Sequence, residues 1–366
     1  MTPERAAADE HAEDGAALVA PPSEEVLDLA RLDPYLRAAL PAAEGPLSTF
    51  RFAGGHANLT YLLRFGAEGT GAEYILRRPP LGPIPPGAHD MRREHRVLSR
   101  LHEAFPLAPR SLVLCEDESL IGAIFVVTER RRGTNILLDM PERYRGRPEL
   151  NRRIGEMLID RLAELHKVDP AAVGLSDLGR PEGFVQRQFE GWAKRWDAAL
   201  DRPYPQTKPL LDWLRAGLLA PQGGGIVHND WKLDNLLLDP DDPATPTAVL
   251  DWDMCARGDP LLDLGYLLNY WAEPGDPQPW IAAAAMPTWY PGFPSRAEAI
   301  ARYGAASGLD VSAIRWYQVF TAFKLAVIIQ QIYIRYLRGQ TTDHRFASFG
   351  GRVAALIDKA IVMSHN

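Results

Sequence analysis

The stretch from residue 226 to residue 265 limits the possible folds of this chain more than any other, because it alternates polar side chains with short apolar runs. The runs LLL and TAVL predict two strands, and the Pro- and Asp-rich segment DPDDPATP between them predicts a turn. Such a hairpin brings Asn235 and Asp251 to neighbouring ends of adjacent strands. Amide and carboxylate oxygens suit a hard cation such as Mg²⁺, which also binds the oxygens of a phosphate chain. We therefore predict that Asn235 and Asp251 bind one Mg²⁺ ion.

Asp230 lies five residues before Asn235, in the loop that leads into the predicted hairpin. There its carboxylate stands beside the predicted ion and accepts a proton from an incoming hydroxyl. A carboxylate base together with an Asn and an Asp on a metal is an arrangement that phosphoryl transfer requires. We predict Asp230 as this base. A merely polar turn is the alternative, but it leaves the positions of Asn235 and Asp251 unexplained.

The order of these motifs resembles a known family. The pattern H-x-D-x-K-x-x-N followed by a strand and D-W-D is similar to the catalytic and metal-binding loops of the protein-kinase-like superfamily. The continuation GDPLLDLG, residues 258–265, resembles the aminoglycoside phosphotransferase and choline kinase branch. From about residue 47 to residue 272 the likeness is closest to phosphotransferase domains related to those fused to acyl-CoA dehydrogenases.

This resemblance implies an α+β, protein-kinase-like fold with two lobes: a small antiparallel β-sheet N-lobe and a mostly helical C-lobe. It also implies ATP and Mg²⁺ as cofactors and a hydroxyl group of a small molecule as the acceptor. A hydroxy acid, its CoA ester and an aminoglycoside-like compound all remain possible acceptors, because a fold does not fix the substrate.

Further roles near Asp230 follow from the resemblance. Lys232 lies where several protein kinases place a lysine that touches the transferred phosphoryl group, so its charge is expected to stabilise the transition state. His228 is expected to hold the catalytic loop by hydrogen bonds to its backbone. Asp263 is expected to support the same loop through buried hydrogen bonds, which a buried carboxylate needs. Asp253 is either a second metal ligand or a support for the first.

Before these motifs, STFRFAGGHANLTYLLRF predicts a strand, a glycine turn and a second strand. Gly54 and Gly55 allow backbone N–H groups to approach a phosphate chain closely. In the resemblance this hairpin covers the nucleotide, with Asn58 as a further contact. A plain hairpin turn is the alternative.

The strand that follows lacks the lysine that the family uses to hold the nucleotide phosphates, because the first lysine of the chain is Lys167. Arg77 lies where that lysine would lie, and an arginine stays charged and grips phosphate through two nitrogens. Glu94, on a helix predicted over residues 89–101, is its expected partner. Arg78 or a solvated strand end is the alternative to Arg77. Farther on, backbone groups around Glu129 are expected near the adenine.

The chain divides by texture into a tail, a strand-rich part and a helical part. We predict a disordered tail at 1–22, a nucleotide-binding N-lobe at 23–131 that begins with a helix over 24–40, and a helical C-lobe at 132–366 that carries catalysis and acceptor binding. Pro34 is expected at a boundary of the first helix.

Composition narrows the classes of function. The net charge of −7 argues against a nucleic-acid-binding protein. Two distant cysteines suggest a reducing compartment, and the acidic start of the chain is unlike a secretory signal, so we expect a cytoplasmic protein. The apolar segment 320–337 contains Lys324 and Arg335, which favours a buried helix over a membrane span.

Two other functions remain open at this stage. A metal-dependent hydrolase would use His228, Asp230, Asp251 and Asp253 as ligands and would not require a nucleotide. A pseudokinase that binds nucleotide without turnover is suggested by the missing strand lysine, although Asp230 and the metal pair are present.

Overall fold

A computed structural model describes residues 18–53, 58–82, 89–284, 286–341 and 343–365. These described residues form two compact units, one up to residue 135 together with 235–255, the other of 136–234 together with the chain from residue 256 on. Most of the tail predicted at 1–22 lies outside the described residues. The first unit holds an antiparallel sheet and the second is mostly helical, in keeping with the α+β class predicted from the sequence.

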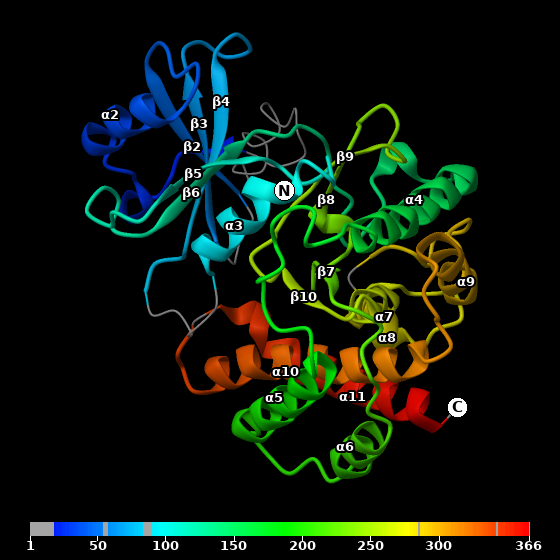
Figure 1. The fold of residues 1–366 in the computed structure, drawn as a ribbon. Helices are drawn as coiled ribbons and strands as arrows, with labels where there is room; N and C mark the ends of the chain where they lie inside the picture. Colours follow the sequence, from blue (N-terminus) through cyan, green and yellow to red (C-terminus); the bar gives the residue numbers. More distant parts are fainter. Residues whose placement is uncertain (1–17, 54–57, 83–88, 285, 342, 366) are drawn as a thin grey trace. The chain divides into compact units, whose positions relative to one another are not determined.

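The first unit is built on a six-stranded antiparallel sheet with strand order β1-β2-β3-β4-β6-β5 (Figure 1). Its strands are β1 (Leu18–Val19), β2 (Leu47–Phe52), β3 (Leu59–Phe65), β4 (Ala72–Arg78), β5 (Ser111–Cys115) and β6 (Phe125–Glu129). Its helices are α2 (Leu29–Ala39) and α3 (Met91–Leu101), and a 3-10 turn, η2, spans Ser23–Glu25. Three of these strands, β2, β3 and β4, lie in the segments from which the sequence predicted them.

Alternation along β4 sends neighbouring side chains to opposite faces of the sheet. Tyr74 and Leu76 lie in the apolar core between the sheet and α2, with Leu32 and Leu36 of the helix. Arg77 therefore projects from the opposite face. This alternation fixes which of the two adjacent arginines faces the remainder of the predicted site.

The expected helix boundary at Pro34 is wrong, because this proline lies inside α2. The helix begins with Asp28, whose side chain accepts hydrogen bonds from the N–H groups of Ala30 and Arg31. Leu32 and Leu36, four residues apart, are fully buried. Burying two leucines contributes about 3–6 kcal/mol, against about 3 kcal/mol for an interior proline, so packing outweighs the local preference.

The hairpin predicted from LLL and TAVL is present as β8 (Leu236–Leu238) and β9 (Pro246–Val249). The hairpin falls within the stretch 132–366 predicted as the C-lobe, whereas in the structure it groups with the first unit. Hydrogen bonds explain the difference. Thr134 and Leu238 exchange two backbone hydrogen bonds of 2.8 Å, and Val249 N–H donates to Leu107 O at 2.8 Å.

The second unit consists mainly of helices around a short two-stranded sheet of β7 (Gly225–Val227) and β10 (Ala256–Gly258) (Figure 1). The helices are α4 (Pro148–His166), α5 (Phe184–Ala199), α6 (Thr207–Ala216), α7 (Leu261–Tyr270), α8 (Gln278–Ala283), α9 (Arg296–Ser307), α10 (Ile314–Leu337) and α11 (Phe349–His365). Shorter 3-10 turns are η3 (Glu142–Tyr144), η4 (Leu233–Asn235) and η5 (His344–Ser348). The last residue of η4, Asn235, belongs to the first unit.

Helix α10 packs against α5, α7 and α11. By length and hydropathy alone it is able to cross a membrane, but a core helix of a globular protein passes the same test, and 61% of its most apolar window is buried within the protein. The residues from Phe320 to Val327 are all buried, which agrees with the buried helix predicted for this segment.

Candidate active site

Arg77 joins two carboxylates in the first unit. Its Nη1 lies 2.7 Å from Glu94 Oε1, and its Nη2 lies 2.8 Å from Asp251 Oδ1. Glu94 is fully buried on α3, in the segment where the sequence predicted a helix. The planar guanidinium offers two separate nitrogens, so one side chain holds both acids at once. Arg77 thereby connects strand β4, helix α3 and the end of the β8–β9 hairpin.

Burial and charge act in opposite directions on this group. Burial alone disfavours the charged form of Arg77, yet Glu94 and Asp251 hold its pKa above the usual value. For Glu94, burial raises the pKa to about 7, with Asp251 and Asp253 adding to the effect and Arg77 opposing it. The raised pKa of Arg77 favours a charged pair, whereas the raised pKa of Glu94 favours a neutral carboxyl group. We describe Arg77 and Glu94 as an ion pair, because an arginine keeps its proton and the 2.7 Å contact is that of a charge-assisted hydrogen bond.

Arg78 has a different role from its neighbour. It is buried, and its Nη1 donates to Ile121 O at 2.6 Å. Arg77 is therefore the arginine that contacts Glu94. Glu129 is occupied locally: its Oε1 accepts from Arg110 N–H at 2.9 Å, and its own N–H donates to Arg110 O at 3.0 Å. The predicted adenine contact of the backbone around Glu129 stays a prediction.

Asn58 links the start of β3 to the D-W-D motif. Its Nδ2 donates to Asp253 Oδ2 at 3.4 Å, and its Oδ1 lies 2.9 Å from His89 Nδ1. Burial and the neighbouring Asp251 raise the pKa of Asp253. Asp253 thus contacts Asn58, another side chain of the first unit. Gly54 and Gly55, predicted to cover the nucleotide, lie outside the described residues.

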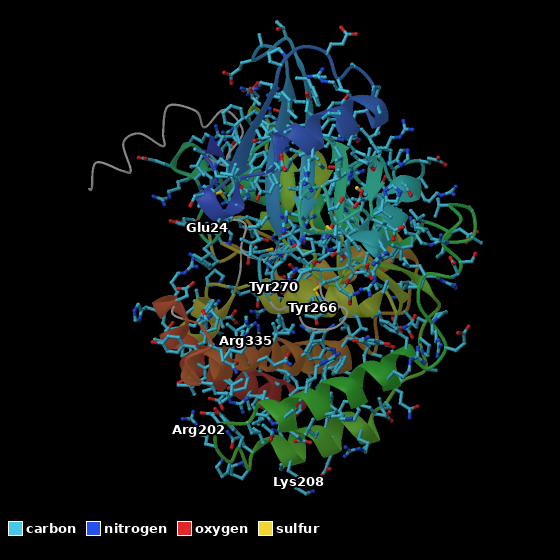
Figure 2. The ribbon with its side chains drawn as sticks, turned by 90° about the vertical axis from the view of Figure 1, so that its left-hand side faces the viewer. Glu24, Arg202, Lys208, Tyr266, Tyr270 and Arg335 are labelled. Carbon is cyan, nitrogen blue, oxygen red and sulfur yellow. The ribbon has the colours of Figure 1, made fainter. Side chains whose placement is uncertain are left out.

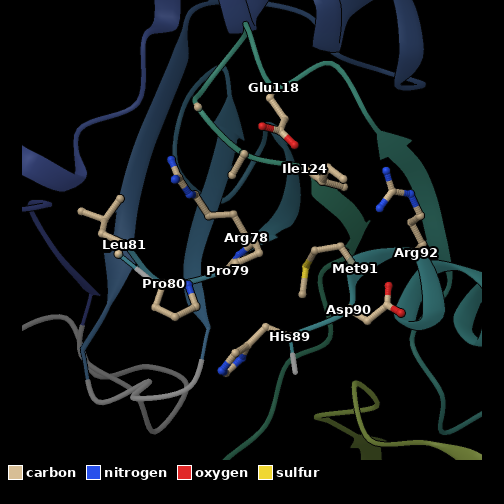
Figure 3. A pocket seen from close by; sticks show the side chains of 13 residues that line it. Arg78, Pro79, Pro80, Leu81, His89, Asp90, Met91, Arg92, Glu118 and Ile124 are labelled. Carbon is tan, nitrogen blue, oxygen red and sulfur yellow. The ribbon is translucent and has the colours of Figure 1, made fainter. Parts of the chain in front are cut away.

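A pocket of about 490 Å³ opens beside the end of β4 and the start of α3 (Figure 3). Its lining includes Arg78, Leu81, His89, Met91 and Ile124. Of the residues considered for nucleotide binding, the described lining contains only Arg78, the alternative to Arg77. The pocket lies at the strand end from which Arg78 projects, and it is not the site built around Arg77.

Asn235 and Asp251 lie at neighbouring ends of the hairpin, as predicted. Leu236 pairs with Val249, and Leu250 N–H donates to Asn235 O at 2.8 Å. Asp251 adopts a left-handed backbone with φ of 65°, which costs about 1 kcal/mol for a residue other than glycine. The surrounding contacts hold this conformation in place.

The two side chains fit a magnesium ion by their chemistry. Both offer oxygen, and the Asp251 side chain keeps 32% of its surface exposed while pairing with Arg77. Among the described residues no group of three or more His, Cys, Asp or Glu side chains forms a metal cluster. Two protein oxygens with the remaining positions left to phosphate and water is the manner in which Mg²⁺ is commonly bound beside nucleotides.

In the second unit, Asp263 of α7 holds the loop before Asp230. Its two carboxylate oxygens accept from His228 N–H at 2.6 Å and from Asn229 N–H at 2.7 Å, and His166 Nε2 lies 3.2 Å from one of them. His228 is fully buried, and its Nδ1 accepts from Asp230 N–H at 3.2 Å. The backbone that presents Asp230 is therefore fixed by the two residues from which the sequence predicted this support.

The side chain of Asp230 has partners that set its orientation. Tyr270 donates its hydroxyl to Asp230 Oδ1 at 2.9 Å, and Lys232 Nζ lies 3.1 Å from Asp230 Oδ2 and 3.3 Å from Asp234 Oδ2. Burial, with Asp230 nearby, raises the pKa of Tyr270 well above its usual value, so the phenol stays a donor. Burial opposes charge on Lys232, but Asp230 and Asp234 hold its pKa above normal.

The sequence motifs did not predict a role for Tyr270. It lies seven residues after Asp263, which is two turns of α7, so both side chains lie on one face of this helix. That spacing was a usable signal once Asp263 was placed beside the catalytic loop. Asp230 and Lys232 belong to the second unit, and Asn235 and Asp251 to the first. The convergence of these two groups on one ion stays a prediction.

We expect Arg77→Lys to weaken the first unit and its affinity for ATP. A lysine carries one nitrogen, so it cannot contact both Glu94 and Asp251 as the guanidinium does. Losing one charge-assisted hydrogen bond costs about 1.5–3 kcal/mol. A lower melting temperature and a weaker stabilisation by ATP with Mg²⁺ are the expected readings in a thermal shift assay. Arg92→Lys, at an exposed ion pair with Glu116, is the control. Equal effects of the two substitutions would contradict the role given to Arg77.

Comparisons with known proteins show similarities over most of this chain. Residues 49–311 match the model of the family described as "Phosphotransferase enzyme family". Acyl-CoA dehydrogenase family member 11 of Gallus gallus is 32% identical over 92% of this chain and 43% of that relative. Family member 10 of Mus musculus is 30% identical over 85% of this chain and 29% of that relative. The chain thus spans less than half the length of these curated relatives.

Solved structures show the same fold. A structure from Ralstonia eutropha, described as a candidate aminoglycoside phosphotransferase, has a TM-score of 0.78 and 29% identity, and covers 93% of this chain and 99% of its own. A choline kinase from Cryptosporidium parvum has a TM-score of 0.57 at 12% identity, over 92% and 98% of the two chains. An ADP-bound aminoglycoside phosphotransferase has a TM-score of 0.56 at 14% identity, over 92% and 99%. The kinase-like α+β fold predicted from the sequence is confirmed.

Proposed function

The chain belongs to the phosphotransferase enzyme family, and from this membership we propose that it transfers the γ-phosphoryl group of ATP to a hydroxyl of a small molecule, with Asp230 as the base. The observation that carries the proposal is the environment of Asp230. A partly buried tyrosine, Tyr270, fixes one of its oxygens, a lysine lies beside the other, and Asp263 holds the preceding backbone.

Asp230 acts mainly by position in this proposal. The transition state of phosphoryl transfer is loose, so the carboxylate orients the acceptor hydroxyl and takes its proton late. The hydrogen bond from Tyr270 keeps Oδ1 in place, which leaves Oδ2 toward the acceptor. Lys232 lies against Oδ2 in the absence of substrate. When phosphate is present, the ammonium exchanges part of this contact for the oxygens of the moving group and stabilises their charge.

The first unit is proposed to hold the nucleotide. Asn235 and Asp251 would bind Mg²⁺, which neutralises charge on the phosphate chain when it is bound. Arg77, aligned by the fully buried Glu94, would contact the phosphates that the family's strand lysine contacts. Asn58 and the backbone near Glu129 would complete the nucleotide contacts. The solved relative with ADP supports a nucleotide of this kind.

For the acceptor we propose a hydroxy acid or its CoA ester ahead of an aminoglycoside. The curated relatives that are about 30% identical carry acyl-CoA dehydrogenase names, so their longer chains are named for chemistry on acyl-CoA compounds. Because this chain spans less than half of them, it is assigned none of the dehydrogenase activity. The similarity to these relatives supports one proposal only, an acceptor that carries an acyl group.

The two rival functions receive less support. The pseudokinase was suggested by the missing lysine, but Arg77 makes the contact with the helix glutamate that such a lysine would make. The hydrolase needs several imidazole and carboxylate ligands around one transition metal, and no such cluster forms among the described residues. A small-molecule kinase accounts for Asp230, Lys232 and the oxygen pair together.

A panel assay separates the three functions. Thermal shift with ATP and Mg²⁺ is followed by ATP consumption over a series of hydroxylated metabolites. The proposal predicts stabilisation by ATP with Mg²⁺ and turnover with at least one acceptor. Stabilisation without turnover on any acceptor would favour a pseudokinase. Stabilisation by Zn²⁺ or Mn²⁺ alone, without nucleotide, would favour the hydrolase.

Asp251→Ala is expected to weaken binding of ATP with Mg²⁺, because it removes one proposed metal ligand and one partner of Arg77. Losing a charged ligand of this kind costs about 1.5–3 kcal/mol, or about ten- to hundredfold in affinity. Calorimetric titration with ATP, repeated over a range of Mg²⁺ concentrations, measures the change. The matched control is Asp241→Ala, an exposed aspartate in the turn of the same hairpin. An unchanged Mg²⁺ dependence in Asp251→Ala would contradict the metal assignment.

A further inference from the structure

Lys324 is a buried cation without a conventional partner. It lies in the middle of α10 with 2% of its surface exposed. Its Nζ is 4.7 Å from the centre of the Tyr266 ring and 5.1 Å from that of Trp192. Within the described residues it forms no hydrogen bond or ion pair. The lysine thus stands where α5, α7 and α10 pack together, with two aromatic faces that favour a positive charge.

Tyr266 offers a second unpaired polar group at the same place. It is buried, and its hydroxyl has no hydrogen-bond partner among the described residues. Its ring stacks on Tyr270, with centroids 6.3 Å apart. Both residues are labelled in Figure 2. Tyr270 in turn donates to Asp230. Lys324, Tyr266, Tyr270 and Asp230 are therefore consecutive neighbours within the second unit.

Unpaired polar groups of this kind are uncommon in a folded interior, because burial removes their water without replacing it. Lys359, another buried lysine of the same unit, shows the ordinary solution: its Nζ donates to Asn269 O at 3.2 Å. Lys324 has no such acceptor. Two polar groups that lack partners beside the proposed base point to a ligand that supplies them.

We propose that the Lys324 ammonium and the Tyr266 hydroxyl bind an anionic oxygen group, of the carboxylate class, on the same acceptor whose hydroxyl is held at Asp230. This inference rests on the proposed function and narrows its acceptor. A carboxylate accepts from both donors at once, and hydrogen bonds between charged partners are the strong ones. Lys324 becomes a specificity-determining residue, distinct from the residues that perform the transfer.

The charge of Lys324 also excludes acceptors. Burial, together with the nearby Arg195, lowers the pKa of Lys324 to about 7, while Asp263 and Asp230 oppose this shift. An arriving anion therefore favours the protonated form. Choline and aminoglycosides, named for two of the structures with this fold, are cations. A cationic acceptor placed here meets a like charge in an interior that screens poorly, which is unfavourable.

Three acceptors of equal chain length test the inference: a hydroxycarboxylate, its neutral amide and the corresponding amino alcohol. The wild-type protein is expected to show a KM for the hydroxycarboxylate about tenfold or more below that of the amide, and little use of the amino alcohol. In Lys324→Met the KM for the hydroxycarboxylate should rise about tenfold or more, with the KM for the amide nearly unchanged. The difference between the two acceptors separates recognition from a general structural loss.

Two further variants keep the test decisive if Lys324→Met folds poorly. Tyr266→Phe retains the ring and removes only the unpaired hydroxyl, so we expect normal stability and a selectively higher KM for the hydroxycarboxylate. Lys359→Met removes a buried lysine whose hydrogen bond is satisfied within the protein. It should lose stability and keep the preference for the hydroxycarboxylate over the amide.

The outcomes distinguish this inference from the proposed function. If Lys324→Met and Tyr266→Phe both keep the wild-type preference for the hydroxycarboxylate over the amide, the role of Lys324 is overturned. A wild-type preference for the amino alcohol overturns it as well. Stabilisation by ATP with Mg²⁺ but no turnover of any hydroxycarboxylate overturns it too, and leaves the proposed nucleotide binding intact. If ATP with Mg²⁺ has no effect, the proposed function fails. Calorimetric titration of the hydroxycarboxylate into wild type and Lys324→Met then decides the inference alone, with weaker binding by the variant expected.

Discussion

Replacing Asp230 by Asn is expected to lower kcat about 10³-fold, within the range typical of a lost general base, while affinity for ATP with Mg²⁺ stays close to that of wild type. The asparagine keeps an oxygen to accept from Tyr270, so the side chain should remain oriented. What it loses is the ability to take a proton and the negative charge beside Lys232. Steady-state kinetics with the best acceptor of the panel, together with calorimetric titration of ATP, measure the two effects separately.

Asp234→Asn is the charge-matched comparison for this experiment. Asp234 also lies within 3.3 Å of Lys232, but it has no proposed part in taking the proton. We expect a loss of less than about tenfold in kcat, the size of a weakened contact between partly exposed charges. A similar loss in both variants would mean that Asp230 acts through Lys232 alone. Near-normal turnover in Asp230→Asn would remove it as the base.

Asp263→Ala is expected to destabilise the second unit by about 3–5 kcal/mol. The carboxylate is fully buried and accepts from two backbone N–H groups, those of His228 and Asn229. Removing it leaves both donors buried without an acceptor, at about 1–3 kcal/mol each. It also frees His166, which lies 3.2 Å from the carboxylate. The change is read as a shift in the urea midpoint followed by tryptophan fluorescence.

The matched control is Asp160→Ala, which breaks a partly exposed pair with Arg302 in the same unit. Exposed ion pairs contribute about 0–1 kcal/mol, so this variant should unfold close to wild type. Asp263→Asn should lie between the two, because it retains one acceptor oxygen. If Asp263→Ala unfolds within about 1 kcal/mol of wild type, the loop before Asp230 is held by other contacts than the buried carboxylate.

Local pattern was sufficient to predict the hairpin and the cationic strand end. The turn-rich segment between two apolar runs determined the register that places Asn235 near Asp251. Period-2 alternation along β4 puts Arg77 and Arg78 on opposite faces of the sheet, but the packing of α2 on one face was needed to decide between them. The hairpin and the position of the two arginines depend on neighbours in sequence, whereas the choice between the arginines does not.

Features that depend on packing between distant segments were not predictable in this way. Pro34 entered the helix because Leu32 and Leu36 gain more by burial than the proline costs. The hairpin joined the first unit through hydrogen bonds to Thr134 and Leu107, far away along the chain. Lys324 interrupts an apolar segment, and sequence alone showed it as a mark against a membrane span.

The neighbourhood of Tyr266, Tyr270 and Lys324 shows why the acceptor side was the least predictable part. The three residues come from two helices, and their relation to Asp230 arises from helix packing that no local motif encodes. The motif predicts where the phosphoryl group moves. The proposed acceptor contacts are not part of that motif, and a shared fold does not determine them.

The central claim is that Asp230, Asn235 and Asp251 act on one magnesium-bound triphosphate. The most direct test is an experimental structure of the protein with Mg²⁺ and a non-hydrolysable ATP analogue. We predict one Mg²⁺ ion bonded to side-chain oxygens of Asn235 and Asp251, with the γ-phosphoryl group facing the carboxylate of Asp230. A nucleotide bound away from the metal pair, or an Asp230 carboxylate that faces a different cavity, would contradict the claim.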